Sequence, residues 1–164
     1  GFGRTGKMFA VDHYDLSPDI MTVAKSMAGG FPMGATLLGE RVVELDKGIH
    51  GSTFGGNPLA AAASLAALNA LVDEKLPERA AELGAYFLAE LQKIESPLVR
   101  GVRGMGLMLG IEIKTKVAPY LKALTERGIL ALPAGMTVIR FLPPLVIEKE
   151  QIDEVVKVLK EILQ

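Results

Sequence analysis

Apolar side chains recur at helical spacing in three segments of the second half of the chain. The segments cover residues 78–94, 117–127 and 149–163, and in each the apolar residues fall on one side of a helix. Pro77 precedes the first segment, and Gly128 follows the second at a position where glycine commonly ends a helix. We therefore expect amphipathic helices in all of these segments.

Short apolar runs elsewhere suit the strands of a sheet. They cover residues 34–39, 99–103, 106–113, 129–132 and 138–141. A short helix is expected at 41–45. Strands that alternate with helices favour a small α/β domain over 74–164, whereas 1–73 read as the end of a larger domain with an open sheet. The sequence thus predicts an α/β protein with a domain boundary near Asp73.

An alanine-rich segment, 59–72, has high helix propensity and follows a loop with the composition of a phosphate site. Asn57 can cap this helix, and Pro58 suits its first turn. Ser52 and Thr53 offer hydroxyls, and the glycines around them let backbone amides approach an anion. The alternative is a glycine-rich turn that only joins a strand to a helix.

Lys25 is a lone cation after a short apolar run and before a glycine pair. Other lysines, such as Lys93 and Lys157, stand near charged residues on segments that read as solvated faces. Partial burial among apolar neighbours would favour the uncharged amine of Lys25, which is a nucleophile toward an aldehyde. The alternative is a lysine that extends from the end of a strand into water.

A nucleophilic lysine and a phosphate loop together suggest a cofactor with both an aldehyde and a phosphate, and pyridoxal 5′-phosphate is such a cofactor. Several motifs then resemble the class III aminotransferases in order and spacing. They are GFGRTGKMFA at 1–10, GGFPMGA at 29–35, HGSTFGGNPL at 50–59, RGMGLMLGIE at 103–112 and AGMTVIRFLPP at 134–144. Within that family the resemblance is to the acetylornithine and ornithine type, including enzymes that act on carrier-bound lysine or ornithine.

The resemblance implies roles for particular residues. Lys25 corresponds to the catalytic lysine that binds the cofactor and moves a proton. Thr53, with Ser52 beside it, corresponds to the hydroxyl that reaches the cofactor phosphate of the neighbouring subunit, which implies a homodimer with a shared active site. Arg140 corresponds to the arginine that binds a substrate carboxylate, a partner that a guanidinium on an apolar strand also suits. A salt bridge from Arg140 to a glutamate of its own domain is the alternative.

The resemblance also implies an architecture and a reaction. Residues 1–73 would form the end of a fold type I pyridoxal-phosphate transferase large domain, and 74–164 its small C-terminal α/β domain. The reaction would move the ω-amino group of an acylated ornithine or lysine to 2-oxoglutarate, in arginine or lysine biosynthesis. Groups that hold the cofactor ring would precede Gly1, so the chain alone is expected to lack part of the site.

Two alternatives to this reaction remain open. One is another class III enzyme, such as an aminobutyrate aminotransferase or a semialdehyde aminomutase. The other is a truncated chain that acts only in assembly.

The composition of the chain argues against several classes of binding partner. Lysine and arginine total 18 against 19 acidic residues, and a net charge of −1 argues against binding to nucleic acid or anionic lipid. The chain has no cysteine and two histidines, so no metal site is expected. The apolar stretch at 59–72 is too short to span a membrane, and we expect a cytoplasmic protein.

Overall fold

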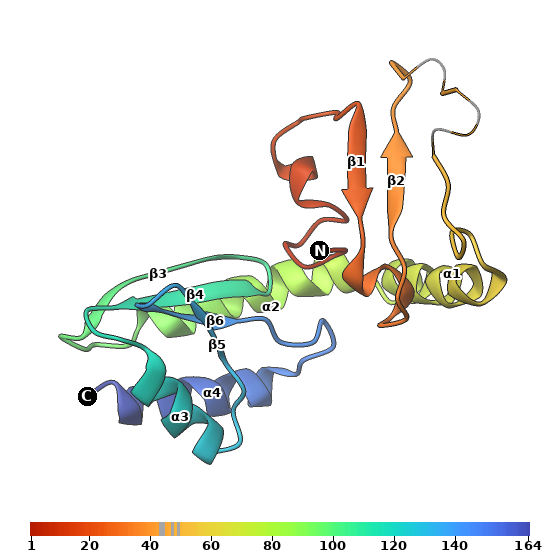
Figure 1. The fold of residues 1–164 in the computed structure, drawn as a ribbon. Coiled ribbons are helices and arrows are strands. Elements are labelled where there is room, and N and C mark those ends of the chain that lie inside the picture. Colours follow the sequence, from red (N-terminus) through yellow and green to blue (C-terminus); the bar gives the residue numbers. More distant parts are fainter. Residues whose placement is uncertain (43–44, 47, 49) are drawn as a thin grey trace.

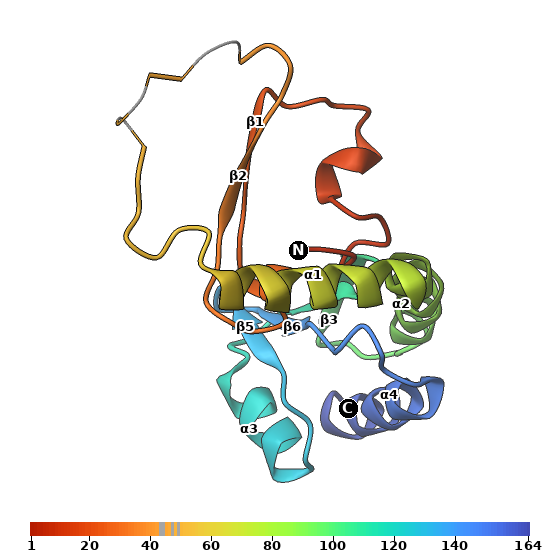
Figure 2. The same ribbon diagram turned by 90° about the vertical axis from the view of Figure 1, so that its right-hand side faces the viewer.

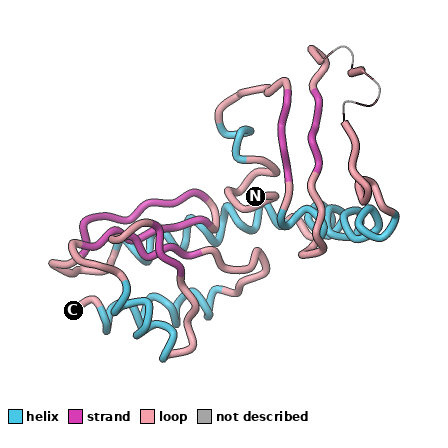
Figure 3. Tube along the Cα trace, in the orientation of Figure 1, coloured by secondary structure: helices cyan, strands magenta, loops and turns pink. Residues whose placement is uncertain are grey.

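The computed structural model describes residues 1–42, 45–46, 48 and 50–164. Figure 2 shows two parts of the chain on opposite sides of helix α1 (Pro58–Asp73), and in Figure 1 the C-terminal part lies to the left of the N-terminal strands. The N-terminal part contains a two-stranded sheet and long loops, and the C-terminal part contains a four-stranded sheet with helices packed against it. Figure 3 shows how much of the N-terminal part is loop.

The N-terminal part is built around an antiparallel pair of strands. Its elements are η1 (Ala10–His13), β1 (Ile20–Val23), η2 (Lys25–Ala28) and β2 (Ala35–Leu38). The strand predicted at 34–39 is confirmed as Ala35–Leu38. Because the sheet has only two strands, most β2 side chains are exposed in this chain. The helix predicted at 41–45 lies partly outside the described residues.

Helix α1 begins as the sequence predicts. The Asn57 side-chain oxygen accepts a hydrogen bond from the amide of Ala60 at 2.9 Å, and Pro58 is the first helical residue. Further along the helix, the buried Ser64 donates its hydroxyl hydrogen to the carbonyl of Met27 at 3.2 Å. The middle of α1 therefore supports the segment that carries Lys25.

The C-terminal part is a four-stranded antiparallel sheet in the order β3-β4-β6-β5. Its elements are α2 (Leu76–Gln92), β3 (Val99–Met105), β4 (Met108–Ile113), α3 (Ala118–Glu126), β5 (Leu132–Ala134), β6 (Val138–Phe141) and α4 (Lys149–Ile162). Alternate strand residues such as Ile111 and Ile139 are fully buried and share one core with Phe87 of α2 and Ile152 of α4. This core confirms the amphipathic helices predicted from the sequence.

Strand β5 begins later than the predicted strand at 129–132. The amide of Gly128 donates to the carbonyl of Thr125, and the amide of Ile129 donates to the carbonyl of Leu124. These bonds close the last turn of α3, with Gly128 in the left-handed conformation. The strand can pair only after this cap, so it starts at Leu132.

The N-terminal segment joins the two parts through close backbone packing. A Cβ atom on Gly106, in the turn between β3 and β4, would lie 2.5 Å from the carbonyl carbon of Thr5. A Cβ atom on Gly84 of α2 would in turn collide with the backbone of Gly106. Three backbone segments therefore stack here, and only residues without side chains allow this approach.

Candidate active site

Lys25 lies at the junction of β1 and η2, in an unusual backbone conformation. Its φ of 57° falls in the left-handed region, which costs a residue with a side chain about 1–2 kcal/mol. Such conformations persist only where the surrounding structure fixes them, and they cluster at functional sites. Here the following residues fix it, because Ala28 is buried and Gly29 approaches Ala67 of α1.

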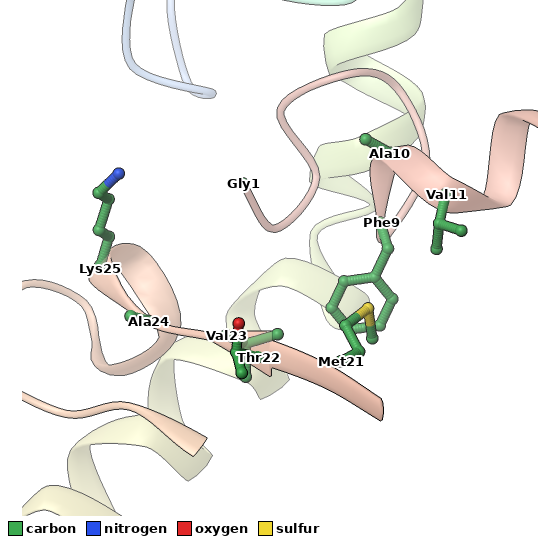
Figure 4. A pocket seen from close by; sticks show the side chains of 9 residues that line it. All are labelled: Gly1, Phe9, Ala10, Val11, Met21, Thr22, Val23, Ala24 and Lys25. Carbon is green, nitrogen blue, oxygen red and sulfur yellow. The ribbon is translucent and has the colours of Figure 1, made fainter. Parts of the chain in front are cut away.

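The Lys25 side chain lines a cavity of about 400 Å³ between the N-terminal segment and β1. The other lining residues are Gly1, Phe9, Ala10, Val11, Met21, Thr22, Val23 and Ala24. Figure 4 shows the amine projecting away from the ribbon, while Phe9 and Met21 lie close together on the other side of the cavity. Within the described part of the chain, the Lys25 amine has no hydrogen-bond or ion-pair partner.

The expected partial burial of Lys25 is wrong for this chain, in which the residue is exposed. The chain turns at Lys25, so that Met27 and Ala28 face α1 while the lysine faces outward. The apolar neighbours in the sequence therefore do not shelter the amine. Instead the arrangement leaves it free to reach a ligand in the cavity.

Ser52 and Thr53 lie in an ordered turn directly before α1. The amide of Gly55 donates to the Ser52 carbonyl at 3.3 Å, and the Asn57 side-chain amide donates to the Phe54 carbonyl at 2.9 Å. Both hydroxyl residues are exposed. The turn thus presents two hydroxyls beside a helix N-terminus, a combination that suits a phosphate.

Within one chain, the structure does not bring this turn to Lys25. No residue of the 50–57 segment lines the Lys25 cavity. The lysine segment contacts α1 at Ser64, whereas the turn ends at Asn57, about 10 Å away along the helix axis. The shared site that the resemblance implies, with the hydroxyls serving a neighbouring subunit, stays a prediction.

Arg140 lies on the open face of the four-stranded sheet. It stands opposite Gly110 of β4, which in turn stands opposite Arg103 of β3. Because Gly110 has no side chain, a space of about 330 Å³ with a largely apolar lining opens at this row. The buried Nε of Arg140 has no hydrogen-bond acceptor among the described residues.

The alternative for Arg140, a salt bridge within its own domain, is not found in the described residues. Glu112 pairs instead with Arg103, whose guanidinium lies 2.7 Å from its carboxylate, and with Arg100 at 3.8 Å. The Arg103 hydrogen bond and the charges of both arginines lower the pKa of Glu112. The described residues thus provide no hydrogen-bond or ion-pair partner for the Arg140 side chain.

The sequence-based reasoning missed Arg4. Its guanidinium donates hydrogen bonds from one nitrogen to the carbonyls of Leu107, at 3.2 Å, and Pro143. These partners stand more than a hundred positions away in sequence, so no local pattern points to them. Only the position of Arg4 in a glycine-rich motif, GFGRTG, could have drawn attention to it.

Two further findings bear on ligands and location. In residues 1–42, 45–46, 48 and 50–164, no group of three or more histidine, cysteine or acidic side chains could hold a metal ion. None of the helices described combines the length and the hydropathy needed to cross a bilayer.

Comparison with known proteins identifies the family. The model of the family described as Aminotransferase class-III matches residues 1–163. A LysW-aminoadipate semialdehyde transaminase of Deinococcus radiodurans is 51% identical over 165 residues, which cover 99% of this chain and 38% of that protein. An acetylornithine aminotransferase of Methanothermobacter thermautotrophicus is 51% identical over 166 residues, 99% of this chain and 43% of its own. The chain thus spans less than half the length of these relatives.

Solved structures agree with the sequence comparison. The acetylornithine aminotransferase from Elizabethkingia anophelis superposes with a TM-score of 0.92 at 41% identity, over 99% of this chain and 45% of its own. An ornithine aminotransferase from Toxoplasma gondii superposes with a TM-score of 0.91 at 37% identity, over 99% of this chain and 40% of its own. That structure is described with partial occupancy of pyridoxal phosphate at its active site. The resemblance and the α/β class expected from the sequence are confirmed, and the chain belongs to the class III aminotransferases, which depend on pyridoxal phosphate.

Proposed function

We propose that the protein containing this chain moves the ω-amino group of an acylated ornithine or lysine to 2-oxoglutarate, in arginine or lysine biosynthesis. The observation that carries the proposal is the unpartnered Lys25 amine at a cavity in a class III chain. The substrate class is supported by relatives named as an acetylornithine aminotransferase and a LysW-aminoadipate semialdehyde transaminase, each at 51% identity. A homodimer with a shared active site completes the proposal.

The residues fit pyridoxal phosphate. The cofactor needs an amine for its aldehyde, and Lys25 offers one that no described residue occupies. It also needs donors for its phosphate, and the Ser52–Thr53 turn presents hydroxyls at the start of α1. When bound, the cofactor supplies an electron sink for charge that develops on the substrate carbon.

Each residue then has a defined task. Lys25 would hold the cofactor through its amine, and its Nζ would serve as the general base that takes a proton from the substrate carbon. Arg140 binds a substrate carboxylate through its guanidinium, which has no partner among the described residues. Ser52 and Thr53 would hold the phosphate of the cofactor in the neighbouring subunit.

Replacing Lys25 by alanine in the full-length protein tests this proposal. We expect multiple-turnover transamination from acetylornithine to fall by about 1000-fold or more, because general acid–base catalysis alone contributes about 100- to 10,000-fold. Borohydride reduction of the wild-type protein with pyridoxal phosphate should label the peptide that contains Lys25. Mass spectrometry of the digest measures that label.

Lys75→Ala is the matched control, because Lys75 is also exposed and also has a left-handed φ, of 51°. Its activity and its label should equal those of the wild type. Label on another lysine, or ordinary turnover in the Lys25→Ala protein, would refute the role of Lys25. A labelled protein that prefers 4-aminobutyrate to acetylornithine would refute the substrate class alone.

A further inference from the structure

Arg4 connects two loops of the C-terminal part to the N-terminal segment. One guanidinium nitrogen donates to the carbonyl of Leu107, in the turn between β3 and β4, and to that of Pro143, in the loop after β6. The backbone takes part as well, because the amide of Leu107 donates to the carbonyl of Arg4 at 3.0 Å. Arg4 is therefore bonded to both loops at once.

The glycines around Arg4 make this contact stiff. Gly106 approaches the backbone of Arg4 so closely that a Cβ atom would lie 2.6 Å from the Arg4 carbonyl oxygen. Gly6 also packs against backbone, that of Ala81, whereas Gly3 packs against the side chains of Leu71 and Leu145. Backbones in such contact cannot slide past one another without losing the packing on all sides.

The Arg4 side chain is held by directed bonds rather than by an opposite charge. It is half-buried, burial lowers the pKa of its guanidinium, and no acidic partner faces it among the described residues. Its hydrogen bonds to two carbonyls are charge-assisted, and they require both loops to keep their positions relative to Arg4.

The geometry at stake is that of the candidate site. Gly1, in the same segment as Arg4, lines the Lys25 cavity. Pro143 lies two residues after the end of the strand that carries Arg140. One path from Lys25 to Arg140 therefore runs through the hydrogen bonds of Arg4.

We propose that Arg4 is a positioning residue that fixes Arg140 relative to Lys25, and so sets how tightly the protein binds the carboxylate of its substrate. The proposal rests on the roles of Lys25 and Arg140 proposed above. Loss of the Arg4 side chain frees the loop after β6, and the guanidinium of Arg140 then samples positions in which it misses the carboxylate. Binding of the carboxylate weakens, while proton transfer at Lys25 is little affected.

The test uses Arg4→Met, which keeps the length of the side chain without its donors, in the full-length protein with bound cofactor. We expect the KM for 2-oxoglutarate to rise about 10-fold while kcat changes less than about threefold, since misplacement by about 1 Å costs up to about 100-fold. Arg4→Lys keeps the charge, and its KM should lie between those of the wild type and Arg4→Met. Arg41→Met is the control, because Arg41 is an exposed arginine of the same part that pairs with Asp19.

A double variant separates positioning from general damage. If Arg4 acts through Arg140, adding Arg4→Met to Arg140→Lys raises the KM no further, because coupled residues are not additive. A merely structural role would instead multiply the two effects. Such multiplication overturns the proposal.

Hydrogen–deuterium exchange gives a readout that does not depend on activity. Peptides that cover 105–110 and 138–145 should exchange faster in Arg4→Met than in the wild type and in Arg41→Met. Exchange equal to that of the control overturns the proposal. If Arg140→Lys leaves the KM unchanged, the proposed function loses its carboxylate site, and the exchange data still decide whether Arg4 holds the strand.

Discussion

At the scale of single residues, Gly106 shows how one missing side chain shapes the molecule. Replacement by alanine would place Cβ 2.5 Å from the Thr5 carbonyl carbon and 2.8 Å from the Gly6 amide nitrogen, at a φ of 54°. We expect Gly106→Ala to destabilise the full-length protein by about 3 kcal/mol or more, because the contacts are with backbone that cannot yield. Thermal unfolding followed by circular dichroism measures the loss.

Gly135→Ala is the control for this prediction. Gly135 also has a left-handed φ, of 69°, but no atom lies within 4 Å of its Cβ position. Gly135→Ala should therefore lower the free energy of unfolding only by the conformational strain, about 1 kcal/mol. Equal losses in both variants would show that the stacking at Gly106 contributes nothing.

The ion pair between Glu112 and Arg103 makes part of the stability dependent on pH. The pKa of Glu112 is lowered in the folded protein, so its charge stabilises the fold above the unfolded pKa of about 4.3. That contribution is lost as the pH falls through the lower, folded pKa. We expect Glu112→Gln to melt below the wild type at pH 7, and the two melting temperatures to converge as the pH falls through the folded pKa of Glu112.

Glu126→Gln controls for the loss of a surface charge. Glu126 is exposed and faces Lys122 at 3.8 Å, a distance typical of a weak pair. Its melting curve should follow the wild type at every pH. A gap between the melting temperatures of Glu112→Gln and the wild type that does not narrow as the pH falls would contradict the pairing.

At the scale of elements, helix α1 depends on its first residues. Asn57 accepts a hydrogen bond from Ala60 and donates one to Phe54, both at 2.9 Å, and so joins the hydroxyl-bearing turn to the helix. Asn57→Ala should lower the free energy of unfolding by about 1 kcal/mol. It should also weaken cofactor binding, because the turn loses an anchor. Fluorescence titration with pyridoxal phosphate measures the binding.

Asn69→Ala on the same helix is the matched control. Asn69 is exposed in the middle of α1, where alanine has the higher helix propensity. This variant should be as stable as the wild type or slightly more stable. If both variants behaved alike, the cap would have no special role.

Elements whose signals are local could be predicted from the sequence. The helix predicted at 59–72 is observed at Pro58–Asp73, and the helix predicted at 78–94 is observed at Leu76–Gln92. The agreement is close because the periodicity and the caps lie within each segment itself. Strand β5 was misplaced because the amide of Ile129 is used to close α3. That competition depends on three-dimensional bonding rather than on hydropathy.

In the candidate site, too, the residues with local signals could be predicted, whereas their arrangement in space could not. Motifs pointed to Lys25, Thr53 and Arg140, but the exposure of Lys25 and its distance from Thr53 depend on how the chain turns. Arg4 could not be predicted, because its partners Leu107 and Pro143 come together only in the folded molecule. Non-local contacts of this kind leave no periodic signal.

At the scale of the whole molecule, α1 presents an apolar surface. Leu59, Leu65 and Val72 are 65%, 63% and 60% exposed, and Phe54 in the preceding turn is 79% exposed. Large exposed apolar patches mark surfaces that other protein normally covers. We expect residues 1–164 in isolation to bind the dye ANS and to self-associate, measured by fluorescence and light scattering, and the full-length protein to do neither.

Charged substitutions locate that surface. Leu59→Glu with Leu65→Glu should abolish self-association of the isolated chain. Leu130→Glu should not, although Leu130 is 85% exposed, because it lies before β5 and outside α1. Self-association that persists in the first variant would assign the contact to another face.

At position 25, the residue that best fits the left-handed backbone is not the residue that the proposed chemistry needs. Glycine would relieve the strain that lysine bears at a φ of 57°, so the most heat-resistant version of this segment is one without the reactive amine. A laboratory selection that rewards thermal survival alone would therefore drift toward an inert protein. Improvement of such a catalyst has to screen for turnover in every round.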